Sequence, residues 1–298
     1  MNFDEFKEAV LATMQERFGS DVEVFLKTQQ KNNGVVLEGL SLKKSNNAVS
    51  PVFYLEEFYE RYKREDMNID EVCDELMDAY NGAAQCVDFD VMEHFNDFDW
   101  IKKRLVANLV NTELNKELLK DVPNVLKADL SVVFRIKVTS EEAGEGSILV
   151  RNEHLAIWGA TVNDLMAAAS DKRNTFMRPV FDARFAPAMY VLTNESKLHG
   201  AAVLLNEKFM REFAEQFNKS LVILPSSVHE VIAVPTDVID EATLNNFEEM
   251  VRSVNTTQLR EDEVLSNHPY VYDIESKQLL TPEEYLGGVG GQKNVHTM

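Results

Sequence analysis

The sequence predicts an α+β fold: a helix-rich N-terminal half with a β-hairpin, and a C-terminal half with a mixed or antiparallel sheet flanked by helices. Apolar residues recur at helical spacing through much of the first half. In the second half, apolar runs of strand length are separated by turn residues. The composition, with 45% hydrophobic and 27% charged residues and only 12 glycines and 8 prolines among 298, excludes collagen-like or mainly disordered chains.

The N-terminal segment predicts a helix followed by a β-hairpin. Apolar residues recur at helical spacing over residues 3–18. Residues 22–26 then alternate between apolar and polar side chains, and a second apolar run covers 35–40. Because the Asn33-Gly34 pair between the two runs is typical of tight hairpin turns, we expect the runs to pair as antiparallel strands.

Three further helices are expected after the hairpin, over about residues 54–64, 69–82 and 90–118. Pro123 ends this part of the chain, since proline cannot continue a helix. We therefore expect a domain boundary there. The predicted regions are an acidic helical and hairpin region at 1–122, a β-rich α+β region at 123–281 and a flexible glycine-containing tail at 282–298.

The β-rich region is expected to begin with a strand at 130–138 and a short strand at 148–150. Thr161 and Asp164 are spaced as in a capping box, which predicts the start of a helix. The other elements expected are β-rich runs at 188–192 and 201–205, a helix at about 206–218, strands at 221–224 and 228–234, and a helix at about 241–253.

The net charge limits the classes of partner. The chain has 50 acidic and 30 basic residues, a formal net charge of −20. Because nucleic-acid affinity comes largely from Lys and Arg, we expect no direct nucleic-acid binding and no docking on anionic membranes. The chain has no apolar run of membrane-spanning length, no signal-peptide pattern at its N-terminus and only two cysteines. The expected location is the cytoplasm.

The negative charge is concentrated between residues 54 and 100, where fifteen acidic residues accompany three basic ones. On the helix expected over 69–82, Asp70, Asp74 and Asp78 recur four residues apart and so share one face. One interpretation is a solvated face that keeps the protein soluble. The alternative is an interaction surface that attracts a basic protein partner or imitates a nucleic-acid backbone.

The most distinctive polar sequence is Pro225-Ser226-Ser227-Val228-His229-Glu230, the Pro-Ser-Ser corner, which lies between two apolar runs. If a strand begins at residue 228, Ser227 and His229 point to one face and Glu230 to the other. A serine nucleophile and a histidine base would make a hydrolase-like site of Ser226, Ser227, His229 and Glu230, and a pocket there with Asp237 or another acid nearby would favour it. The alternative is a structural corner in which the serine hydroxyls satisfy turn amides.

No motif indicates a cofactor or a metal. The chain has no P-loop, no Gly-x-Gly-x-x-Gly and no EF-hand loop, and its six histidines are not spaced as metal ligands. His229-Glu230 resembles the start of a zincin motif, but Ala233 occupies the position of the second histidine. We therefore expect no cofactor and no bound metal.

Six segments together carry a family resemblance. They are Asn32–Val35, Ser50–Glu56, Asn152–Gly159, Tyr190–Asn194, Gly200–Ala202 and Leu224–Glu230. In this order they resemble an uncharacterised bacterial family of unknown function that is common in gut anaerobes, and the resemblance extends over residues 3–280. Its most specific part is the Leu-Pro-Ser-Ser-x-His-Glu string. The resemblance implies one integrated α+β unit in the bacterial cytoplasm, and it implies no activity, substrate or catalytic residue.

Three functions are compatible with these observations. The first is a non-catalytic interaction protein, because the charge is concentrated and no complete catalytic constellation is present. The second is a hydrolase-like enzyme that uses the Pro-Ser-Ser corner. The third is an inhibitor that mimics nucleic acid, which requires carboxylates spaced like phosphates. Salt-sensitive partner binding would favour the first, and a cleft beside His229 would favour the second.

Overall fold

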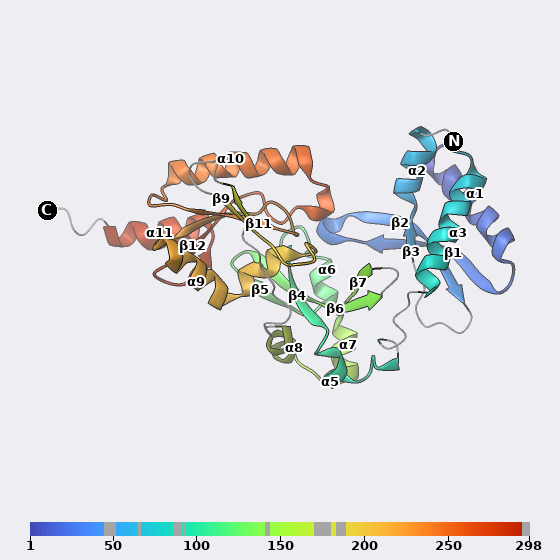
Figure 1. Cartoon of the computed structure of the whole chain (residues 1–298), viewed down its shortest axis with the longest axis horizontal. Coiled ribbons are helices and arrows are strands. Elements are labelled where there is room, and N and C mark those ends of the chain that lie inside the picture. Colours follow the sequence, from blue (N-terminus) through green and yellow to red (C-terminus); the bar gives the residue numbers. More distant parts are fainter. Residues whose placement is uncertain are drawn as a thin grey trace. The chain divides into compact units, whose positions relative to one another are not determined.

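The computed structural model describes residues 1–44, 52–64, 67–85, 91, 93–140, 144–169, 180–182 and 189–293. Helices and antiparallel sheets are interspersed along these residues (Figure 1), which confirms the predicted α+β class. The chain forms two compact units. The first unit comprises Met1–Asp97 and Lys137–Ser147, and the second comprises Phe98–Ile136 and Ile148–Met298.

The first unit is built on a three-stranded antiparallel sheet in the order β1-β2-β3. Its elements are α1 (Phe3–Phe18), β1 (Val22–Gln30), η1 (Asn32–Gly34), β2 (Val36–Lys44), β3 (Val52–Tyr54), α2 (Leu55–Arg64) and α3 (Ile69–Gln85). The N-terminal helix, the hairpin and the next two helices are therefore confirmed. In the hairpin turn Asn33 and Gly34 have φ angles of 58° and 73°, a left-handed conformation that Asn and Gly adopt at low cost.

The core of the first unit lies between the helices and the sheet. Phe6, Val10 and Met14 on α1 have no exposed surface, and their spacing places them on one face of the helix. The rings of Tyr59 and Tyr62 on α2 have centroids 5.2 Å from that of Phe6. Burial of these large apolar side chains supplies the main stabilisation of the unit.

The second unit contains a smaller and a larger sheet among its described residues. In the smaller sheet β6 lies between β4 and β5, and β7 also pairs with β6. Lys137–Ser147, in the hairpin of β6 and β7, is grouped with the first unit. The elements of this part are α5 (Phe98–Ile101), β4 (Leu105–Asn111), α6 (Leu118–Asp121), β5 (Asn124–Lys127), β6 (Leu130–Ser140), β7 (Gly144–Leu149), α7 (Asn152–Trp158) and α8 (Val162–Ala169).

The larger sheet has the strand order β13-β12-β10-β11-β9-β8, and neighbouring strands are antiparallel. Val222 and Val271 pack in the same cluster as residues of α10 and α11, whereas Tyr190 packs against Phe213 and Phe217 of α9. Helices therefore cover both faces of this sheet (Figure 1). Its elements are β8 (Val180–Asp182), β9 (Met189–Leu192), η3 (Gly200–Leu205), α9 (Glu207–Phe217), β10 (Leu221–Leu224), β11 (Val231–Pro235), α10 (Glu241–Gln258), η4 (Glu261–Glu263), β12 (Tyr270–Asp273), β13 (Gln278–Leu280) and α11 (Pro282–Lys293).

Two predicted elements differ in type from the elements observed. The helix expected over 90–118 is interrupted by β4, because Leu105–Asn111 pairs along its whole length with β6. A short apolar run fits a helix or a buried strand equally well, and the distant partner decides between them. The β-rich run expected at 201–205 is instead the 3₁₀ helix η3, in which Gly200–Leu204 is buried.

The segment expected as a flexible tail contains a helix, and its flexibility stays a prediction. Residues from Pro282 onward form α11, and residues 294–298 lie outside the described part of the chain. Thr281 and Glu284 cap the helix reciprocally, with N···O distances of 2.8 and 3.2 Å. Tyr285 is 9% exposed and packs in the core beside the larger sheet, so the first turn of α11 contacts that core.

The division of the chain into two compact units does not follow the boundary expected after residue 122. Residues 98–122 belong to the second unit. The reason is the pairing of β4 with β6, which joins a segment before Pro123 to a strand after it. Proline marks the end of a local element, and the tertiary grouping follows from strand pairing.

Candidate functional site

The Pro-Ser-Ser corner connects β10 and β11 inside the larger sheet. Its residues form a turn in which the Ser227 amide donates to the Glu230 carbonyl, with an N···O distance of 3.1 Å. β11 begins only at Val231. The expectation of a strand from residue 228 is therefore wrong, and Ser227 and His229 do not alternate along a strand.

Neighbouring segments fix the backbone of the corner. The Val228 amide donates to the Glu263 carbonyl of η4 at 2.8 Å, and the Val228 carbonyl accepts from the Ala201 amide of η3 at 3.3 Å. Ser227 is 6% exposed, and its Oγ accepts a hydrogen bond from the His229 amide at 3.0 Å. The hydroxyl therefore serves as a turn acceptor, as in the structural interpretation of the corner.

The imidazole of His229 has one nitrogen bonded to the backbone and the other directed at a carboxylate. Its Nδ1 accepts a hydrogen bond from the His199 amide at 3.1 Å, so the neutral ring carries its proton on Nε2. Nε2 lies 3.8 Å from Oε1 of Glu263, and both side chains are 29% exposed. In the part of the chain that the structure describes, no hydrogen bond joins this ring to Ser227 Oγ.

The loop before η3 completes the surroundings of His229. Thr193 Oγ1 donates to the His229 carbonyl at 2.7 Å, and the rings of His199 and His229 have centroids 5.5 Å apart. His199 has a φ of 54°, a left-handed conformation that is uncommon outside glycine and needs support from its surroundings. Burial, and after it the positive charge of Arg135, lowers the pKa of His199 to about 3, so this ring is neutral near pH 7.

These contacts give the serine and the histidine separate partners. A nucleophilic serine needs a base within hydrogen-bonding reach, whereas Ser227 Oγ and His229 Nδ1 each accept from a backbone amide. Glu230 contributes its carbonyl to the turn. Asp237, the acid expected nearby, accepts from Lys219 at 2.7 Å. The catalytic roles of Ser227, His229 and Glu230 stay a prediction.

Replacing Ser227 with alanine is expected to lower the free energy of unfolding by about 1–2 kcal/mol, because the His229 amide loses its acceptor in a buried turn. Urea denaturation followed by tryptophan fluorescence measures this loss, since Trp100 and Trp158 both belong to the second unit. Ser226→Ala is the matched control, because Ser226 is partly exposed. Equal losses in the two variants would contradict this role of Ser227.

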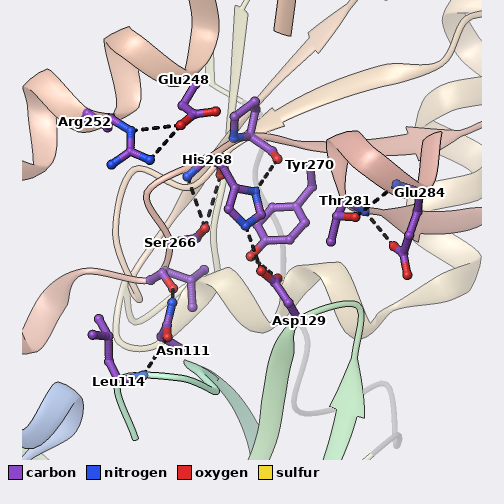
Figure 2. Close-up of polar contacts among 12 residues, drawn as sticks. Asn111, Leu114, Asp129, Glu248, Arg252, Ser266, His268, Tyr270, Thr281 and Glu284 are labelled. Atoms are coloured by element: carbon purple, nitrogen blue, oxygen red, sulfur yellow. Dashed lines mark hydrogen bonds and ion pairs between the residues drawn. The ribbon is translucent and has the colours of Figure 1, made fainter. Parts of the chain in front are cut away.

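A second polar cluster in the second unit was not identified from the sequence (Figure 2). Asp129 lies in the turn between β5 and β6, and its Oδ2 is 2.7 Å from Nε2 of His268, two residues before β12. The other carboxylate oxygen accepts from the hydroxyl of Tyr270 at 2.6 Å. Tyr270 is fully buried, whereas the side chains of Asp129 and His268 are 46% and 26% exposed. The cluster joins the smaller sheet to the larger one.

Both ring nitrogens of His268 face hydrogen-bond acceptors. Nδ1 lies 2.8 Å from the Pro269 carbonyl oxygen, and Nε2 faces the Asp129 carboxylate. Since an ionised carboxylate and a carbonyl only accept, the ring makes both bonds only as an imidazolium. With both nitrogens engaged, this ring has no free lone pair with which to act as a base.

The pKa shifts of the pair agree with this ionic form. Burial lowers the pKa of His268, but the hydrogen bonds to Asp129 and to the Pro269 carbonyl outweigh it, and the pKa is raised overall. For Asp129, burial raises the pKa of the carboxyl group, but the bonds from His268 and Tyr270 outweigh it, and the pKa is lowered. The two shifts favour the charged form of each partner.

The acidic face expected on the helix over 69–82 lies on α3 and is partly paired. The carboxylates of Asp70 and Asp74 are 79% and 70% exposed, and they contact the Arg17 guanidinium of α1 at 2.9 and 2.6 Å. Asp78 is exposed on the same helix. One cation therefore lies beside two of the three predicted surface residues, which gives Asp70 and Asp74 a role in the contact between α1 and α3.

No group of three or more His, Cys, Asp or Glu side chains in the described ranges could hold a metal ion. Within the same ranges, no helix combines the length and the apolar character that a membrane span requires.

The sequence matches the model of a family of unknown function, DUF5688, over residues 3–183 and 179–274. The chain belongs to this family. The match confirms the resemblance to an uncharacterised family, and it includes the Pro-Ser-Ser corner. No curated protein and no solved structure matches this DUF5688 chain.

Proposed function

We propose that this DUF5688 protein is a non-catalytic interaction protein whose acidic face on α3 binds a basic protein partner. The observation that supports the proposal is the charge of α3, which has five carboxylates and no basic residue. Arg17 pairs with Asp70 and Asp74, and Arg61 pairs with Glu75. Even with these ion pairs, the helix and its partners carry more negative than positive charge.

An exposed excess of carboxylates acts mainly on the rate and selectivity of association. It attracts a cationic surface within a Debye length, about 8–10 Å at physiological ionic strength. Such attraction accelerates encounter and disfavours acidic partners, and salt screens it. The proposal therefore implies a basic partner whose binding weakens as the salt concentration rises.

Asp78→Lys is the variant that isolates the surface charge. Reversal at Asp70 or Asp74 would also break the contact with Arg17. Reversal at Glu71 would remove the acceptor of the Asn68 amide, at 2.8 Å, at the start of α3. Glu249→Lys provides the control, because Glu249 is exposed on α10 and its reversal changes the net charge equally.

The test uses a basic protein isolated from the source cells with the full-length wild-type chain and then purified. We expect Asp78→Lys to raise its dissociation constant about two- to fivefold at low salt, with Glu249→Lys close to wild type. The difference should vanish at high salt. Calorimetric titration measures these constants. Equal weakening by both variants, or binding that does not respond to salt, would overturn the proposal.

A further inference from the structure

The contact between Asp129 and His268 links two distant segments, and its strength depends on one proton. Asp129 belongs to the β5–β6 turn of the smaller sheet, and His268 leads into β12 of the larger sheet. The partners are 139 positions apart in the sequence, so their contact joins distant segments of the chain. The Tyr270 hydroxyl binds the same carboxylate from a fully buried position.

Loss of one proton from His268 breaks one of its two contacts. A neutral imidazole carries a single N–H, whereas the ring faces two acceptors, the Asp129 carboxylate and the Pro269 carbonyl. Whichever nitrogen loses its proton then directs a lone pair at an oxygen. Because an ionised carboxylate is a stronger acceptor than a carbonyl, the remaining N–H stays on Asp129, and the contact with Asp129 loses the attraction between two opposite charges.

The other charged groups around the ring come from β12 and α10. Tyr270 binds Asp129, as described above. Glu248 of α10 acts on His268 through its negative charge, which favours the imidazolium. Arg252 holds Glu248, with nitrogen–oxygen distances of 2.9 and 2.7 Å (Figure 2). The Ser266 hydroxyl accepts from the His268 amide at 3.3 Å, and so fixes the backbone beside the ring.

We propose that protonation of His268 strengthens the contact of the β5–β6 turn with the larger sheet, and that deprotonation weakens it, so that pH tunes the contact between the two sheets of the second unit. The inference is independent of the acidic face on α3. It assigns to the second unit a pH-sensitive contact, in which the His268 ring is the sensor and the β5–β6 turn is the element whose stability responds.

The pH range follows from the directions of the two pKa shifts. His268 has a raised pKa, so its stabilisation is complete below the unfolded-chain value of about 6.5 and is lost as pH rises through the folded value. Asp129 has a lowered pKa, so its stabilisation is present above about 4 and is lost as pH falls through the folded value. The contact is therefore strongest between the folded pKa of Asp129 and that of His268, and it weakens as pH rises through the folded pKa of His268.

The first test is an NMR titration of the full-length chain with labelled histidines, with His268→Gln to assign the signal. We expect His268 to titrate above the unfolded-chain value, and Asp129→Asn to lower its midpoint. His154 provides an internal control of opposite sign, because burial lowers its pKa. A wild-type His268 that titrates at or below the unfolded-chain value would overturn the proposal.

The second test is hydrogen exchange of the segments at 127–131 and 265–270 across the His268 titration, corrected for the intrinsic pH dependence. In the wild type, we expect the protection of the backbone amides of these segments against exchange to fall about tenfold as the His268 ring loses its proton. In His268→Gln, protection should not depend on pH in this range. A pH dependence that is the same in wild type and variant would show that another group controls the protection of these segments, and would contradict the proposal.

Discussion

Replacing Gly200 with alanine is expected to destabilise the second unit by about 3 kcal/mol. A Cβ atom at this position would overlap Thr193 Oγ1 and the His229 carbonyl oxygen, and it would lie 2.8 Å from the Asn194 amide nitrogen. Two of these atoms belong to the backbone, so a change of side-chain rotamer cannot remove the clash. Relief requires a shift of the loop before η3 or of the Pro-Ser-Ser corner.

Urea denaturation followed by tryptophan fluorescence measures this effect, because both tryptophans belong to the second unit. Gly287→Ala is the control, since a Cβ at that exposed position of α11 would contact nothing within 4 Å. The control should be neutral or stabilising by up to about 1 kcal/mol, because alanine favours a helix over glycine. If Gly200→Ala were equally well tolerated, the close packing at Gly200 would be refuted.

Replacing Phe6 with alanine is expected to cost the first unit about 3–5 kcal/mol. The side chain has no exposed surface, and its ring packs against those of Tyr59 and Tyr62. Truncation removes the apolar contacts and leaves a cavity that the two rings of α2 cannot fill without moving. The lost free energy of unfolding therefore has two parts: the hydrophobic free energy of burying the removed atoms, and the cost of the cavity that remains.

Far-UV circular dichroism during urea denaturation measures this loss, since the first unit contains no tryptophan. Phe3→Ala on the same helix is the matched control, because it makes the same chemical change at a partly exposed position. We expect the control to lose less than half as much stability as Phe6→Ala. Similar losses at the two positions would contradict the burial of Phe6 as the source of the effect.

Elements with strong local signals were predictable from the sequence. The helix over 3–18 and the Asn33-Gly34 hairpin carry their own spacing and turn residues, and the structure has them where they were expected. The strand over Leu105–Asn111 carries no such signal. Its structure depends on pairing with β6, which begins at Leu130, and a helix fits the same apolar residues.

The candidate site likewise has a part that could be recognised from the sequence and a part that could not. The Pro-Ser-Ser corner was recognisable because its serines, proline and histidine are adjacent in the sequence. Its partners were not recognisable, since His199 lies 30 positions before His229 and Glu263 comes from η4. The Asp129–His268 contact lacks any local motif. The available signal was the alternation of His268 with Tyr270, the first residue of β12, and it does not identify a partner.

The hydrogen bond that sets the tautomer of His229 comes from the main chain of residue 199 and not from its side chain. The left-handed backbone that presents this amide is one that Asn and Gly adopt more readily than His. A related chain can therefore carry a different residue there and still place the imidazole proton on Nε2. What such chains would share at this position is a backbone conformation, which an alignment of residue types does not reveal.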